Sequence, residues 1–197
     1  MILTHSGKTP TIDPTAYVAS NATLCGDVRI GPHCRVMFGA CIVAEGGSIE
    51  LGSHCIVLEN AVIRSTVRHS TRIGAHCLVG PNAHLVGCTL EDEVFVATGA
   101  AIFHGAVLRA RSEVRINGVV HLRTELPADA TVPIGWVAVG TPATILPPNN
   151  HDAIWAIQKP LNFPLTAYGI DRSEASMVNI TERMAEFLGG HRDDVVG

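Results

Sequence analysis

Histidines and cysteines are the residues of this 197-residue chain that could bind a metal or move protons. The chain has ten histidines and six cysteines, and His33, His54 and His76 recur in the same local pattern, each followed directly by a cysteine. Neutral imidazole binds transition metals and titrates near neutral pH. A column of such histidines could therefore bind a metal or respond to pH, or it could be a column of solvated turn residues.

The cysteines lack the spacing of a metal-binding or redox motif. None of them forms a CxxC pair, which argues against a zinc ribbon or a thioredoxin-like site. The N-terminus has no basic-then-apolar signal-peptide pattern. We therefore expect reduced cysteines, with Cys34, Cys55 and Cys77 facing inward beside the histidine column.

An aliphatic residue recurs every six positions and indicates the elements that carry these side chains. The count slips at residues 46–48 and 65–72, and it loses one residue after Leu85. The aliphatic positions are Val18, Leu24, Ile30, Val36, Ile42, Leu51, Val57, Ile63, Ile73, Val79, Leu85, Leu90, Val96, Ile102 and Leu108.

A six-residue period is typical of a triangular coil made of three short strands and three turns. A small residue four positions after each aliphatic would let the chain bend, and successive coils would stack through parallel pairing. A β-sandwich would instead show alternation with period two. We predict a left-handed parallel β-helix over residues 10–148, with the regular repeat fading after Ile116. One coil apart, the three histidines should stack about 4.8 Å from each other in an outward ladder that continues at Glu93.

The remaining residues, 149–197, carry helical signals. One helix is expected after Asp152 and should stop at Pro160, and a proline-containing connector should follow over residues 161–168. Asp171 would open a capping box, and the helix should end at Gly189-Gly190. The expected apolar stripe is Met177, Ile180, Met184, Phe187 and Leu188. This helix should pack on the β-helix or a neighbouring subunit, or else dock a foreign partner.

Charge and hydropathy argue against several classes of partner. Fourteen basic and 18 acidic residues give a net charge of −4, so neither nucleic acid nor an anionic membrane surface is expected as a partner. No apolar run approaches the roughly 20 residues of a membrane span. We expect a cytoplasmic protein.

Two motifs make residues 10–148 resemble the γ-class carbonic anhydrase family. These motifs are Gly26-Asp-Val-Arg-Ile-Gly31 and Val139-Gly-Thr-Pro-Ala143, and the second is shared with hexapeptide acyltransferases. Residues 42–52 also resemble the small β-helical subunits of dynactin. The resemblance implies a homotrimer with sites between adjacent β-helices.

The family's metal-binding histidines are replaced in this chain. On the family's motifs, the three histidine positions fall on Arg64, Pro81 and Val86. Arginine stays protonated, and proline and valine have no side-chain donor. Without zinc there is no route to hydroxide at neutral pH. We therefore expect no metal, no cofactor and no ordinary CO2 hydration.

A small polar cluster could remain at that position. The family's Arg-Gly-Asp segment matches Val43-Ala44-Glu45, and its Asn-Ile-Gln-Asp segment ends at Glu59. The resemblance implies that Glu45, Glu59 and Arg64 lie close together. Arg64 could bind an anion or a carboxylate through its planar fork of donors. Alternatively, an Arg–Glu pair fills the space that the metal occupies in the family.

His84 and His104 are candidates for acid–base chemistry, because hexapeptide acyltransferases use a histidine near the subunit boundary as general base. His104, in an expected turn, is the better candidate catalytic residue. We assign Glu45, Glu59, Arg64 and His84 to substrate binding. A surface histidine without a catalytic role is the alternative for His104.

The chemistry of these residues leaves three hypotheses. The first is a γ-carbonic-anhydrase-like homotrimer that acts as a binding or structural module, with a small anionic or acyl ligand at the subunit interface. The second is a metal-independent acyltransferase or acyl-CoA enzyme that uses the same cleft. The third is a metalloprotein with relocated histidines.

Overall fold

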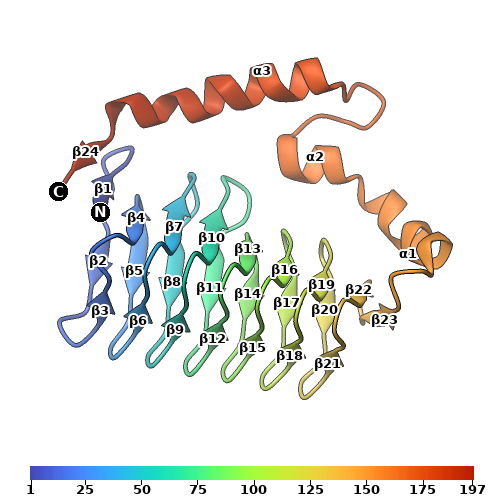
Figure 1. Cartoon of the computed structure of the whole chain (residues 1–197). Helices are drawn as coiled ribbons and strands as arrows, with labels where there is room; N and C mark the ends of the chain where they lie inside the picture. The colour runs from blue at the N-terminus through green and yellow to red at the C-terminus, as the bar shows by residue number, and fades with distance from the viewer.

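The chain winds into a parallel β-helix, and a helical segment folds back over one side of it (Figure 1). The computed structural model describes residues 1–197. Each coil contributes one strand to each of three sheets, so that strands three apart in the chain are neighbours. The predicted left-handed parallel β-helix of hexapeptide repeats is confirmed.

The first sheet has ten strands and faces the helical segment. Its parallel strands are β1 (Ile2–Thr4), β4 (Thr23–Cys25), β7 (Cys41–Ala44), β10 (Val62–Ser65), β13 (His84–Val86), β16 (Ala101–Ile102), β19 (Val119–Val120) and β22 (Val137–Val139). Antiparallel strands close both ends of this sheet: β23 (Thr144–Leu146) pairs with β22, and β24 (Val195–Val196) pairs with β1. The first coil thus begins at Ile2, ahead of residue 10.

The other two sheets have seven strands each. The second contains β2 (Thr11–Ile12), β5 (Val28–Ile30), β8 (Ile49–Leu51), β11 (Thr71–Ile73), β14 (Thr89–Leu90), β17 (Val107–Leu108) and β20 (Glu125–Leu126). The third contains β3 (Tyr17–Val18), β6 (Arg35–Val36), β9 (Ile56–Val57), β12 (Leu78–Val79), β15 (Phe95–Val96), β18 (Glu113–Val114) and β21 (Thr131–Val132).

The core is the stack of aliphatic side chains that the six-residue period predicts. From Leu24 to Leu108 every predicted position is buried, whereas Val18, in the first coil, is only partly buried. The expectation that the repeat fades after Ile116 is wrong. The same six-residue step continues at Val132 and at Ala138. Both residues are fully buried, and their strands pair in register with those of the preceding coil.

The histidine and cysteine columns form as predicted. His33, His54 and His76 are exposed, with ring centroids 4.7 and 4.9 Å apart, and each has a φ near +58°. Glu93 continues the column with the same positive φ. The neighbouring cysteines are buried, and their thiols donate to carbonyl groups of the next coil, as Cys34 does to Gly52 at 2.9 Å.

The C-terminal segment contains three α-helices and two 3-10 turns. They are α1 (His151–Gln158), η1 (Lys159–Leu161), α2 (Phe163–Tyr168), α3 (Met177–Leu188) and η2 (Gly189–Asp193). The connector expected over residues 161–168 is in fact largely α2, because Pro164 lies in its first turn, where no backbone donor is needed. The capping box at Asp171 is also wrong: Ser176 is the N-cap of α3, and its Oγ accepts from the Asn179 N–H.

Helix α3 crosses the β-helix from its C-terminal coils back toward β1 (Figure 1). It has no fully buried residue, and its apolar stripe is covered only in part: Ile180 and Met184 are partly buried, whereas Met177 is 69% exposed and Phe187 43% exposed. The single chain therefore leaves the ends of this stripe uncovered. None of the helices has the length and apolar character needed to cross a membrane.

Candidate functional site

A pocket of about 460 Å³ lies between the outer face of the first sheet and helices α2 and α3. Its β-helix wall comes from β10, β13 and the turn after β16, and its opposite wall comes from residues 163–169 and the middle of α3. Pockets of this size hold small organic ligands. The pocket contains four of the five predicted site residues, namely Glu45, Arg64, His84 and His104.

Arg64 and Glu45 form an ion pair at the floor of this pocket. Parallel pairing aligns Arg64 with Val43 on one side and Val86 on the other. The Arg64 Nη2 donates to Glu45 Oε1 at 2.8 Å, and the Glu45 side chain is only 5% exposed while that of Arg64 is 34% exposed. The predicted Arg–Glu pair is therefore present, and open space remains beside it.

Two histidines add imidazole nitrogens to the same wall. His104, in the turn after β16, is 7% exposed, so the alternative of a surface histidine is wrong. Burial, followed by the charges of His69, His84 and Arg64, lowers the pKa of His104 to about 4. Burial and Arg64 also lower the pKa of His84. The His104 Nδ1 is buried and has no hydrogen-bond partner.

The charge of the lining is predominantly positive. Arg64, Arg68 and Arg183 face the pocket, and Glu45 is the single carboxylate among its lining residues. The apolar part of the wall is largely aromatic: Phe103, Phe163, Tyr168 and Phe187. A positively charged lining with aromatic faces matches a small anion that carries an apolar group.

Glu59 and Pro81 lie away from this pocket. Glu59 is in the turn between the third and first sheets, where its carbonyl accepts from the Asn82 N–H at 3.0 Å. Arg64 is five residues further on, beyond the middle of β10, near the opposite edge of the first sheet. The expected proximity of Glu59 to Glu45 and Arg64 is therefore wrong within one chain.

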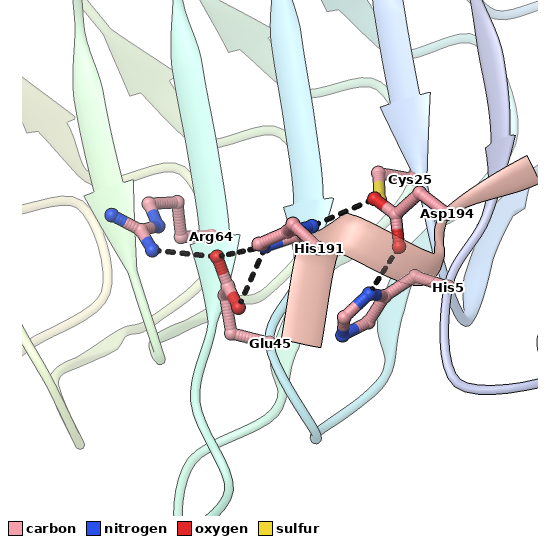
Figure 2. Close-up of polar contacts among 6 residues, drawn as sticks. All are labelled: His5, Cys25, Glu45, Arg64, His191 and Asp194. Carbon is pink, nitrogen blue, oxygen red and sulfur yellow. Dashed lines mark hydrogen bonds and ion pairs between the residues drawn. The ribbon is translucent and has the colours of Figure 1, made fainter. Parts of the chain in front are cut away.

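Sequence reasoning missed a second polar cluster that shares Glu45 (Figure 2). The His191 Nε2 lies 3.1 and 3.3 Å from the two Glu45 oxygens, and its Nδ1 lies 2.7 Å from Asp194 Oδ2. Asp194 also contacts His5 and Cys25. No sequence motif indicates these contacts, because 146 residues separate His191 from Glu45.

Comparison with known proteins places this architecture in a family. No family model matches the chain. It is 29% identical over 182 residues to the mitochondrial γ carbonic anhydrase 1 of Arabidopsis thaliana. The aligned residues cover 89% of this chain and 64% of that protein. It is 30% identical over 140 residues to the carnitine operon protein CaiE of Proteus sp. (strain LE138). The aligned residues cover 62% of this chain and 71% of that protein. The chain belongs to the γ-carbonic-anhydrase-like hexapeptide-repeat family.

A solved structure shares the fold of this γ-carbonic-anhydrase-like chain. A hexapeptide transferase family protein from Anaplasma phagocytophilum superposes with a TM-score of 0.55 at 24% identity, over 95% of this chain and 97% of that one. The present chain spans less than two thirds of the length of the Arabidopsis γ carbonic anhydrases 1 and 2, at 64% and 50%. Similarity therefore shows family and fold, and activity has to be argued from the pocket.

Proposed function

We propose that this protein is a γ-carbonic-anhydrase-like trimer that binds a small organic anion and does not hydrate CO2. The observation that supports the proposal most directly is Arg64. On the family's motifs it falls at the position of a metal-binding histidine, and it lines a pocket with three arginines and one carboxylate.

The zinc chemistry of the family does not fit these residues. Arg64 remains protonated and is engaged with Glu45, and a fixed cation at that place repels a second one. Val86, aligned with Arg64 across the sheet, is 6% exposed and has no donor atom. Pro81 offers no side-chain ligand either. The three positions together leave no ligand set for a catalytic zinc.

An organic carboxylate fits the pocket better than a metal does. The ion pair with Glu45 uses one nitrogen of the Arg64 guanidinium, and Arg68 and Arg183 provide two further cations. The imidazole of His104 lines the same pocket. Aromatic faces of Phe163 and Tyr168 would cover the apolar part of the ligand.

A trimer would complete this site. The outward positions of the second sheet carry charges, such as Arg29, Glu50 and Arg72. The middle of the third sheet carries Ile56, Leu78 and Phe95, between Arg35 and Glu113. The ends of the apolar stripe of α3 are also open in the single chain. Covering these apolar surfaces by neighbouring copies would bring the Glu59 corner of one subunit toward the pocket of another.

Two measurements test the proposal. Stopped-flow CO2 hydration by the purified full chain, supplied with Zn²⁺, should equal the buffer rate, and chelator-sensitive hydration would overturn this part. Calorimetric titration with acetate and benzoate should show saturable binding that is stronger for benzoate. No saturable binding of either carboxylate would contradict the anion pocket.

The pocket also supports a second function, metal-independent acyl transfer. His104 lines the cavity, and burial lowers its pKa to about 4, so its imidazole is neutral at pH 7. As general base it would take the proton from an acceptor hydroxyl or amine that attacks the thioester carbon of an acyl-CoA, and CoA thiolate would leave. Thiol release from acetyl-CoA in the presence of amine acceptors, abolished in His104→Gln, would favour this function. A rate that His104→Gln leaves unchanged would exclude it.

A further inference from the structure

The second polar cluster lies where the two ends of the chain meet. His5 follows β1, Cys25 ends β4, and His191 and Asp194 lie in and just after η2. Antiparallel pairing of β24 with β1, through Leu3 and Val196, holds the C-terminal residues in place over the first coils. Figure 2 shows all four side chains turned toward one another.

The donor atoms of these four residues are close enough to bind one ion. One ligand atom from each of His5, Cys25, His191 and Asp194 lies within 4.8 Å of all the others. The Cys25 Sγ lies 3.6 Å from Asp194 Oδ2, and this oxygen lies 2.7 Å from His191 Nδ1. The ligand atoms of a tetrahedral zinc site are about 3.4 Å apart, given bond lengths near 2.1 Å. Shifts of about 1 Å would therefore reach that geometry.

The shielding and chemistry of the donors also match a metal. The His5 and Asp194 side chains are 11% and 10% exposed, and Cys25 is 1% exposed. Two imidazoles, a thiol and a carboxylate are the donor types that zinc prefers. Cysteine binds a divalent cation as the thiolate, so metal binding at Cys25 would release a proton.

Glu45 supplies the outer support that metal-binding histidines usually have. His191 presents Nδ1 to the cluster while its Nε2 contacts the Glu45 carboxylate at 3.1 Å. This contact fixes the orientation of the ring, because a histidine bound to a metal through one nitrogen donates from the other. Arg64 in turn holds Glu45 at 2.8 Å. Glu45 and His191 are therefore placed as the outer pair of a carboxylate–histidine–metal arrangement.

We propose that His5, Cys25, His191 and Asp194 form a binding site for Zn²⁺ or a similar divalent transition metal. The ion fastens the C-terminal segment to the first two coils, because two ligands come from each end of the chain. The site is separate from the family's zinc positions, since none of Arg64, Pro81 and Val86 belongs to it. The sequence predicts no metal, but the placement of these four side chains supports the third hypothesis, a metalloprotein with relocated ligands.

Metal titration of the full chain, purified without an affinity tag and stripped with a chelator, tests this site. We expect one Zn²⁺ per chain by elemental analysis and a rise of several degrees in Tm on adding Zn²⁺. Co²⁺ should give the absorption of a cobalt–thiolate bond. Binding of less than half an equivalent of added Zn²⁺ per chain, or a Tm that Zn²⁺ leaves unchanged, would contradict the proposal.

Matched variants locate the ion. Cys25→Ser should abolish the cobalt–thiolate absorption and lower Zn²⁺ affinity at least tenfold, whereas Cys41→Ser, on the adjacent strand, should change neither. His33→Ala is the control for the exposed histidine ladder. If Cys25→Ser fails to fold, Asp194→Asn, which keeps the size of the side chain and one acceptor oxygen, should still lower the affinity. Absorption that persists in Cys25→Ser, or is lost in Cys41→Ser, would place the metal elsewhere and overturn the assignment.

Discussion

Arg64 connects the pocket to the second polar cluster through a single carboxylate. Its guanidinium contacts Glu45, and Glu45 contacts His191. A carboxylate that is 5% exposed needs such partners, because an unpaired buried charge is costly. The pocket that Arg64 lines is thus joined, through Glu45, to a network that reaches the C-terminal segment.

Replacing Arg64 by alanine should weaken carboxylate binding at least tenfold. The expected loss follows from the roughly 1.5–3 kcal/mol that a hydrogen bond to a charged group contributes. Calorimetry with benzoate measures the affinity, and chemical denaturation measures any accompanying loss of stability. Arg72→Ala, on the outward face of the second sheet, is the matched control. A loss of stability with unchanged affinity would show that Arg64 only fills space.

The depressed pKa of His104 gives a testable pH dependence. The unfolded chain binds a proton below about pH 6.5, whereas the folded His104 resists protonation until about pH 4. Stability therefore falls as the pH is lowered through this window, by about 2 kcal/mol between pH 7 and 5 for this one group. His104→Gln should remove that part of the slope in urea denaturation at the two pH values. Equal slopes in both proteins would contradict the burial argument.

At the scale of secondary-structure elements, the sequence predicts the coils of the β-helix but only part of the C-terminal helical segment. Ile30 and Leu51 are core residues because the six-residue period repeats in every coil. The later coils keep the same step at Val114, Val120, Leu126 and Val132, and the proline- and glycine-rich turns between them obscure it in the sequence. Helix α2 was missed because Pro164 reads as a helix breaker unless its place in the first turn is known. The Cys25–Asp194 contact depends on long-range folding and leaves no local pattern.

Stacked coils predict that core truncations are costly while outward ones are not. Leu108 is fully buried in β17, and Leu108→Ala should lower the free energy of unfolding by about 2–5 kcal/mol. Val107→Ala, on the outward side of the same strand, should cost about 1 kcal/mol or less. Urea denaturation measures both. Equal losses would mean that the two faces of β17 are buried to the same extent.

At the scale of the whole molecule, the three faces of the β-helix differ in what they offer to a partner. The second sheet presents pairs such as Arg109 with Glu91 and Glu125 at 2.7 Å, which suit contact with solvent. The third sheet presents Tyr17 and Ile56, which are 45% and 36% exposed. The proposed trimer would bury apolar area of this kind.

Phe95→Glu should therefore weaken the proposed trimer. A charge on the outward face of β15 would have to be buried between subunits, so the monomer fraction should rise at micromolar concentration. Sedimentation velocity measures the change. Thr89→Glu, on the charged second sheet, is the control and should leave the oligomer intact. A monomeric parent protein, or a Phe95→Glu variant that assembles as the parent does, would contradict the interface.

The antiparallel strands β23 and β24 have a further consequence for the molecule. A parallel β-helix ends in strands with free backbone donors and acceptors, which can pair with the end of another molecule and continue into a fibre. At the first sheet, β24 covers β1 and β23 covers β22. Each added strand runs against the direction of the coils, so a further coil cannot stack there in the native register. The segment that completes the second polar cluster thus also limits end-to-end polymerisation.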